Sequence, residues 1–271
     1  HGKYPAILED VVVGESAKNL YQDAKKMLAK VINEKKIKAN GVIGFYPANT
    51  INNDDIELYA SENDKDPIFT YYGLRQQTQK PSIKGVQKPN ICLADYIAPK
   101  TSGIKDYIGL FAVTSGINVE LYEKLFEKDQ DDYNGIMIKA ITDRLAEAFA
   151  EYMHDRVRRD LWGYQPKKLT NEDMIQEKYQ GIRPAPGYPA CPEHTVKKDI
   201  FALLQTEEIG MQLTESMAMH PASSVSGFYF AHPDAKYFSV DKINNDQLQD
   251  MASRRSVTPE ILRKWLGPNL R

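Results

Sequence analysis

Hydrophobic positions recur at helical spacing in several parts of the chain. Over residues 15–36, apolar side chains repeat every three or four positions, which predicts an amphipathic helix. The longest pattern of this kind covers residues 133–162. Thr170 and Thr195 are the expected N-caps of two shorter helices, and Pro259 is the expected first residue of a third. The shorter helices are predicted over residues 119–128, 170–179, 195–210 and 259–267.

Runs of β-branched and aromatic residues predict short strands between these helices. His232-Pro233-Asp234 separates the last two runs and is typical of a hairpin turn. The strands come in clusters and seldom alternate with helices, which favours an α+β fold with a mainly antiparallel sheet in one continuous domain. The strand candidates are residues 42–46, 56–59, 68–74, 90–98, 107–114, 225–230 and 237–240.

Composition and charge narrow the class of protein. The chain has 271 residues, of which 42% are hydrophobic and 27% are charged, as in a globular protein. The formal net charge is −2 with both signs mixed along the chain, so nothing indicates binding to nucleic acid or to a membrane surface. No apolar run approaches the roughly 18 residues that a membrane span needs. Cys92 and Cys191 are too few for a disulfide framework, so we expect a reducing, cytoplasmic location.

The stretch RPAPGYPACPEH, residues 183–194, cannot form a helix or a central strand. It holds four prolines, and each has a fixed φ and no amide donor. Arg183 offers a planar donor pair that matches a carboxylate or phosphate, and Tyr188 offers an aromatic face with a polar tip. One interpretation is a rigid loop that binds a small zwitterionic or nucleoside-like molecule. The other is a structural strap across the sheet, and the pattern alone leaves both open.

Few residues form an obvious catalytic or metal-binding motif. The chain has no P-loop, no GxGxxG after a strand, no GxSxG and no HExxH. Cys191 and His194 form a C-x-x-H pair, but a structural zinc site needs four ligands, so a buried cysteine beside a locally bonded histidine is the simpler interpretation. His154 lies among charged residues and is expected on a solvated helix face. Glu147 and Glu151 are one turn apart and are expected to face solvent, unless a second element covers that side and makes it a cleft.

Long stretches of the sequence resemble one known family. The proline-rich stretch is part of GIRPAPGYPACPEHT, and the other stretches follow it or precede it in a fixed order over essentially the whole chain. They include LADYIAP at 93–99, DYIGLFAVTSG at 106–116, DRLAEAFAEYMHDRVRRDLWGY at 143–164, LTESMAMHPASSVSGFYF at 213–230 and KYFSV at 236–240. With these stretches the chain resembles the S-adenosylmethionine-binding activation domain of cobalamin-dependent methionine synthase.

The resemblance implies a fold and a function. The family domain is an α+β, C-shaped or helmet-like structure around a twisted antiparallel sheet, and it is the last module of a large methyltransferase. That enzyme carries a methyl group from methyltetrahydrofolate to homocysteine through cobalamin, which a neighbouring module holds. The activation domain supplies S-adenosylmethionine and a flavodoxin-type protein supplies an electron, so that inactive cob(II)alamin is converted back to methylcobalamin. The alternative is a non-catalytic module that senses S-adenosylmethionine or docks a reductase. An independent methyltransferase is disfavoured, because we find no glycine-rich loop of the usual methyltransferase fold.

The resemblance also implies which residues bind the ligand. The reaction moves no proton at the reacting atoms, so binding residues are expected rather than catalytic ones. Arg183 matches the arginine that holds the methionine carboxylate, and the acidic residues are expected near the ribose hydroxyls, the amino group or the sulfonium. Residues 220–224 are expected to approach the cobalamin. The expected S-adenosylmethionine-binding residues are Arg183, Tyr188, Tyr237, Phe238, Glu147 and Glu177.

The first residue of the chain is His1, and the family domain begins further upstream. The resemblance implies that this upstream segment supplies an aspartate to the ligand site. We therefore expect residues 1–271 to be part of a larger multidomain enzyme, with an N-terminal surface that exposes apolar area. The chain by itself is not expected to produce methionine, because it lacks the folate, homocysteine and cobalamin modules.

Overall fold

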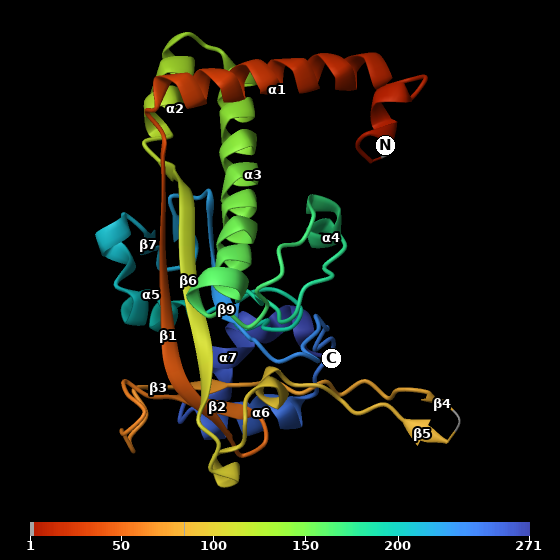
Figure 1. Cartoon of the computed structure of the whole chain (residues 1–271), viewed down its shortest axis with the longest axis vertical. Helices are drawn as coiled ribbons and strands as arrows, with labels where there is room; N and C mark the ends of the chain where they lie inside the picture. Colours follow the sequence, from red (N-terminus) through yellow and green to blue (C-terminus); the bar gives the residue numbers. More distant parts are fainter. Residues whose placement is uncertain (1–2, 84) are drawn as a thin grey trace.

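An antiparallel sheet lies at the centre of the molecule (Figure 1). The computed structural model describes residues 3–83 and 85–271, and within these ranges the main sheet has five strands in the order β3-β2-β1-β6-β9. Every neighbouring pair in this sheet is antiparallel. The strands are β1 (Lys38–Ile51), β2 (Asp55–Leu58), β3 (Phe69–Tyr72), β6 (Asp106–Ile117) and β9 (Ser224–Tyr229). Two small hairpins pair β4 (Ser82–Ile83) with β5 (Val86–Gln87) and β7 (Gln212–Leu213) with β8 (Met219–His220).

Helices cover the sheet and close its ends. Figure 1 shows β1, β6 and α3 running side by side along the molecule, with α1 across one end and α6 and α7 near the other. In this view α1 and the β4–β5 hairpin project to the same side, which gives the C-shaped outline that the resemblance implies. The α-helices are α1 (Gly14–Glu34), α2 (Glu120–Lys128), α3 (Asp132–Arg156), α4 (Asn171–Ile175), α5 (Lys197–Leu204), α6 (Asn245–Arg254) and α7 (Pro259–Leu266). A π-helical turn, Val157–Leu161, continues α3.

Strand β6 lies at the centre of the core, and both of its faces are buried. Successive side chains of a strand point to opposite faces. Leu110 and Ala112 lie in the cluster that includes residues of α5, whereas Phe111 and Val113 pack in a second cluster with Ala150 of α3. This double burial explains why the sequence from residue 107 onward is continuously apolar rather than alternating.

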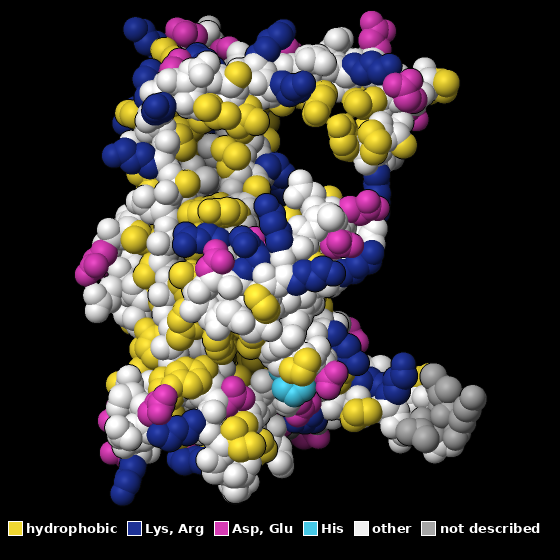
Figure 2. Space-filling model, in the orientation of Figure 1, with side chains coloured by type: hydrophobic (Ala, Val, Ile, Leu, Met, Phe, Trp, Pro, Cys, Tyr) yellow, Lys and Arg dark blue, Asp and Glu magenta, His cyan; other side chains and the backbone are white. Residues whose placement is uncertain are grey.

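The groove between α1 and α3 is apolar. Its volume is about 740 Å³, and Figure 2 shows hydrophobic side chains gathered beneath α1. Val11 and Val12, which precede α1, are also strongly exposed.

In residues 3–83 and 85–271, no helix is both long enough and apolar enough to cross a membrane.

The structure confirms most of the predicted elements but not the strand at residues 90–98. That segment contains a 3₁₀ turn, Leu93–Tyr96. The carboxylate of Asp95 accepts a hydrogen bond from the backbone N–H of Cys92 at 2.9 Å and also binds Arg75. This local bond competes with strand pairing. The apolar residues between 90 and 98 therefore correctly predicted burial of this segment but wrongly predicted a strand.

The hairpin predicted around His232 is also absent from the described structure, since residues 237–240 form no strand. The proline run takes the place beside β9 instead. Ile182 and Phe230 exchange two backbone hydrogen bonds of 3.0 Å, and the N–H of Phe228 donates to the carbonyl of Pro184 at 3.0 Å. The N–H of Val240 then donates to the carbonyl of Pro189 at 2.8 Å, so residues 237–240 line the outer side of the run. The proline run therefore packs against the sheet, as the strap interpretation predicts, while several of its side chains also line a cavity, as the ligand-binding interpretation requires.

The predicted helix caps have mixed outcomes. Thr170 caps α4, because its hydroxyl accepts a hydrogen bond from the N–H of Asp173 at 3.1 Å. Thr195 does not cap α5, which begins at Lys197. Its hydroxyl donates to Glu193 at 2.8 Å, and that carboxylate also accepts from Arg255 of the turn after α6. Glu193 thus connects the strap to the turn after α6. Because the hydroxyl of Thr195 donates to Glu193, it does not cap α5.

Gly227 allows the strap to approach β9. A Cβ atom at this position would overlap the carbonyl oxygen of Pro184 and come within 3.1 Å of Ala185 Cα. We expect Gly227→Ala to lower the free energy of unfolding by about 1–3 kcal/mol, the usual cost of overpacking a core. Urea denaturation followed by circular dichroism measures it. Gly267→Ala is the matched control, because no atom of the described residues lies within 4 Å of its Cβ position. Equal stability of both variants would contradict the argument.

An ion pair attaches α6 to the sheet. Arg254 binds the carboxylate of Asp55, whose side chain is 1% exposed, and donates to the carbonyl of Gly73 at 3.1 Å. Burial raises the pKa of Asp55 above its usual value, although Arg254 opposes this shift. Removing the guanidinium would leave an unpaired buried carboxylate whose pKa rises further.

We therefore expect Arg254→Ala to destabilise the fold by about 3–5 kcal/mol at neutral pH. When a carboxyl group has a higher pKa in the folded state than in the unfolded state, the protein becomes less stable as the pH rises through the folded-state pKa. The loss of stability caused by Arg254→Ala should therefore be smaller in acid than at neutral pH. Urea denaturation at neutral pH and at about pH 5 gives both values. A deficit that grows toward low pH would show that Asp55 is not responsible.

Candidate functional site

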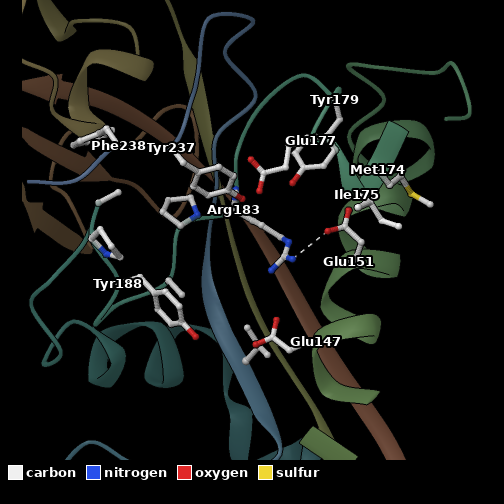
Figure 3. A pocket seen from close by; sticks show the side chains of 15 residues that line it. Glu147, Glu151, Met174, Ile175, Glu177, Tyr179, Arg183, Tyr188, Tyr237 and Phe238 are labelled. Carbon is white, nitrogen blue, oxygen red and sulfur yellow. Dashed lines mark hydrogen bonds and ion pairs between the residues drawn. The ribbon is translucent and has the colours of Figure 1, made fainter. Parts of the chain in front are cut away.

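The proline run, α3, the segment after α4 and residues 237–238 surround a cavity of about 400 Å³ (Figure 3). Ligand pockets for small molecules are typically about 300–1,000 Å³. All six residues expected at the ligand site line this cavity: Glu147, Glu177, Arg183, Tyr188, Tyr237 and Phe238. Four segments thus bring these side chains together, and two of them, α3 and residues 237–238, are far from the other two in the sequence.

The two acids on α3 face the cavity because other elements cover that side of the helix. Glu147 and Glu151 are one turn apart, and Figure 3 shows both on the side of α3 that looks toward the strap. Both are half-buried. The periodicity argument that placed them in solvent is wrong here, because it counted only the face that packs on the sheet. Glu177 follows α4 closely and has a left-handed backbone conformation, with φ 53°. Its side chain lines the cavity.

Arg183 lies at the centre of the cavity wall and is held at two points. Its backbone N–H donates to the hydroxyl of Tyr237 at 3.0 Å, and its Nη2 donates to Oε2 of Glu151 at 3.1 Å. The side chain is 19% exposed, so most of its charge is removed from bulk water. A guanidinium in this position can bind a carboxylate strongly, because the hydrogen bonds are charge-assisted and poorly screened.

Aromatic and apolar side chains form the rest of the wall. Tyr188 is 61% exposed and Tyr237 is 40% exposed, so both have surface available to a ligand. Burial raises the pKa of Tyr179, which keeps its phenol neutral and able to donate a hydrogen bond. The apolar lining consists of Met174, Ile175, Pro184, Ala185, Pro189, Ala190, Val225 and Phe238. Such a wall suits a ligand with a flat apolar part and a charged polar end.

The charges on the wall favour a cationic ligand. Among the described residues that line the cavity, three carry carboxylates and Arg183 carries a guanidinium, so the formal charge is −3 + 1 = −2. A ligand that bears both a carboxylate and positive charge would find partners for each.

The residues around the C-x-x-H pair show no sign of reactivity. Burial raises the pKa of the Cys191 thiol to about 12, and the hydroxyl of Tyr71 lies 3.5 Å from its sulfur. The described parts of the chain contain no group of three or more His, Cys, Asp or Glu side chains that could hold a metal ion.

The sequence analysis did not assign a ligand role to Glu151 or Tyr179, and it misplaced His154. Glu151 could have been found by its four-residue spacing from Glu147, and Tyr179 by its place in the EKYQGIR stretch. His154 is completely buried, with its ring 5.3 Å from that of Tyr229 and 5.0 Å from that of Tyr179. Burial, together with the charges of Arg158 and Arg183, holds the pKa of His154 well below its usual value, so the ring is neutral.

Comparison with known proteins bears on both the fold and the site. The model of the family described as "Vitamin B12 dependent methionine synthase, activation domain" matches residues 1–256. Among solved structures, the chain is similar to the crystal structure of the MetH reactivation domain bound to AdoHcy (S-adenosylhomocysteine), with 52% sequence identity and a TM-score of 0.92. The match covers 100% of this chain and 82% of that one. The chain therefore belongs to the family of activation domains of vitamin B12-dependent methionine synthases.

Proposed function

We propose that the cavity binds S-adenosylmethionine and presents its methyl group to cobalamin on a neighbouring module, as the reactivation step of methionine synthase. The observation that carries this proposal is the convergence of six expected residues from four segments on one cavity. The relative at 52% identity is bound to AdoHcy, which is the demethylated form of the proposed ligand.

The proposed ligand fits the chemistry of the wall. Its methionine carboxylate would bind the guanidinium of Arg183. Its adenosine would lie against the aromatic and apolar side chains, including Tyr188 and Phe238. Its amino group, sulfonium and ribose hydroxyls would face the carboxylates of Glu147 and Glu177. Each charged part of the ligand then has a partner of opposite charge.

The protein's contribution to the reaction would be orientation and electrostatics. Cobalamin in its reduced form supplies a nucleophile, so no side chain of this chain needs to move a proton to it. The cavity residues hold the ligand so that its methyl group can be presented to the neighbouring module. A flavodoxin-type protein would supply the electron, and the chain acts as one module of the enzyme rather than as an independent methyltransferase.

We expect Arg183→Ala to weaken S-adenosylmethionine binding by about 10²-fold, because a buried charge-assisted pair is lost. Isothermal titration calorimetry on the purified chain measures it. Arg263→Ala is the control, since that arginine on α7 is exposed and donates a hydrogen bond to Asn245 at 2.7 Å, away from the cavity lining. Equal affinities of the two variants would place the carboxylate elsewhere.

The methyl-transfer role has a separate test. The chain is mixed with the cobalamin-binding module, a chemical or flavodoxin-type reductant and S-adenosylmethionine labelled in its methyl group. We expect labelled methylcobalamin, detected by its absorption spectrum and by the label, and none when the chain is omitted. Normal ligand binding without methylcobalamin would favour the alternative, a module that senses the ligand or docks a reductase.

A further inference from the structure

Buried polar atoms without a hydrogen-bond partner gather next to the cavity. Within residues 3–83 and 85–271, such side-chain atoms belong to Glu151, His154, Arg158, Arg183 and Tyr229. Unpaired polar atoms are costly in a protein interior and call for an explanation. Their location behind the wall of the cavity suggests that the explanation lies in the ligand site.

Arg158 is the most deeply buried cation of this region. Its side chain is 1% exposed, and neither Nη1 nor Nη2 has a hydrogen-bond partner in the described part of the chain. Its guanidinium lies 4.3 Å from the ring centroid of Tyr179. Nη2 is 3.9 Å from Oε1 of Glu151 and 3.6 Å from Oδ1 of Asp155.

The two carboxylates near Arg158 differ in where their second arginine lies. Asp155 faces Arg158 with Oδ1 and accepts a hydrogen bond at Oδ2 from Nε of Arg159 at 2.9 Å, and Arg159 is not among the described residues that line the cavity. Glu151 binds Arg183 through Oε2 and faces Arg158 with Oε1. Glu151 thus lies between two guanidiniums, one in the cavity wall and one behind it.

The local backbone explains how Arg158 reaches this position. It is the second residue of the π-helical turn Val157–Leu161, where the N–H of Trp162 donates to the carbonyl of Val157 at 2.9 Å. Turns of this kind occur frequently at functional sites, because the wider turn redirects side chains. Arg158 therefore projects into the same buried region as His154 and Glu151, one and two turns earlier.

The negative charge of the cavity wall indicates a role for the positive charge of Arg158. A ligand carboxylate that approaches Arg183 also approaches Glu151, in a wall whose formal charge among the described lining residues is −2. Without a further cation, Glu151 would both repel that carboxylate and occupy the guanidinium. His154 does not supply the charge, since it is neutral.

We propose that Arg158 is a positioning residue, which neutralises Glu151 from behind and so leaves the guanidinium of Arg183 available to the ligand carboxylate. The inference rests on the proposed function, in which an α-amino-acid carboxylate binds Arg183. It adds a residue outside the cavity wall that determines selectivity for ligands carrying this carboxylate.

Two ligands that differ only in the carboxylate test this inference. They are S-adenosylmethionine and its decarboxylated analogue, titrated by calorimetry into the unmodified chain and into Arg158→Met. Methionine has a flexible, unbranched apolar side chain that can replace the arginine stem, and Glu151 and Asp155 each keep a hydrogen bond from another arginine. We expect Arg158→Met to weaken S-adenosylmethionine binding on the order of tenfold, because the carboxylate meets an uncompensated Glu151. Binding of the decarboxylated analogue should change by less than about twofold.

Controls separate this role from a general loss of structure. Arg156→Met removes a neighbouring arginine that is 41% exposed and lies 4.0 Å from Asp160, and it should alter neither affinity. Thermal unfolding confirms that each variant is folded. If Arg158→Met does not fold, Arg158→Lys takes its place, because it keeps a charge but shortens the reach to Glu151. A smaller carboxylate-selective loss is expected for that variant, because its charge remains but lies further from Glu151.

The possible results have distinct meanings. An equal loss for both ligands, or no loss for either, overturns the positioning role of Arg158 while leaving the proposed function intact. Failure of the unmodified chain to bind S-adenosylmethionine overturns the proposed function, and this inference falls with it.

Discussion

The attachment of the proline run to β9 is the interaction on which the rest of the site depends. Proline has no amide donor, and in the described structure the run is held beside β9 by the backbone of Ile182 and by the carbonyl of Pro184. Those few hydrogen bonds lie on both sides of Arg183 along the chain. Because Gly227 has no side chain, the run can lie close against the strand. The backbone of Arg183 is therefore held in place before any ligand is bound, which reduces the entropy lost on binding.

Helix α3 serves the core with one face and the site with another. Phe149 and Ala150 pack against the sheet, whereas Glu147, Glu151 and His154 follow one another at helical spacing on the side of the strap. Buried polar side chains seldom add stability compared with apolar ones. Their presence in the interior is a violation of the usual pattern, and such violations are expected at functional sites.

The site offers charged and aromatic groups suited to binding and orienting a ligand. These groups include a guanidinium, three carboxylates and the phenols of Tyr179 and Tyr237, whose pKa values burial raises. This arrangement agrees with the proposed function, in which a methyl group leaves a sulfonium without proton transfer. It also explains why sequence motifs for nucleophiles and metal sites were not informative. Mutations that alter the charge balance around Arg183 are therefore expected to have the largest effect on ligand binding.

Much of the architecture could be predicted from the sequence, because local periodicity reports which side chains are buried. The helices α1 and α3, the strand β6 and the irregular path of the proline run all followed from spacing and from proline chemistry. Arg183 and Tyr188 were candidates from the chemistry of the proline run, whereas the resemblance was needed to assign Glu147, Glu177, Tyr237 and Phe238 to the ligand site.

Only the tertiary structure decided which partner each buried segment has. Residues 90–98 and 237–240 are apolar enough for strands, yet a local carboxylate bond shapes the first and the strap takes the edge of the sheet beside the second. His154 and Glu151 have the sequence surroundings of a solvated helix. His154 is buried because its ring packs between those of Tyr179 and Tyr229, and Glu151 is half-buried because Arg183, about thirty residues later, binds it. Sequence periodicity describes one helix at a time, so it determines that a side chain can be buried, whereas the contacts between distant segments determine what it binds.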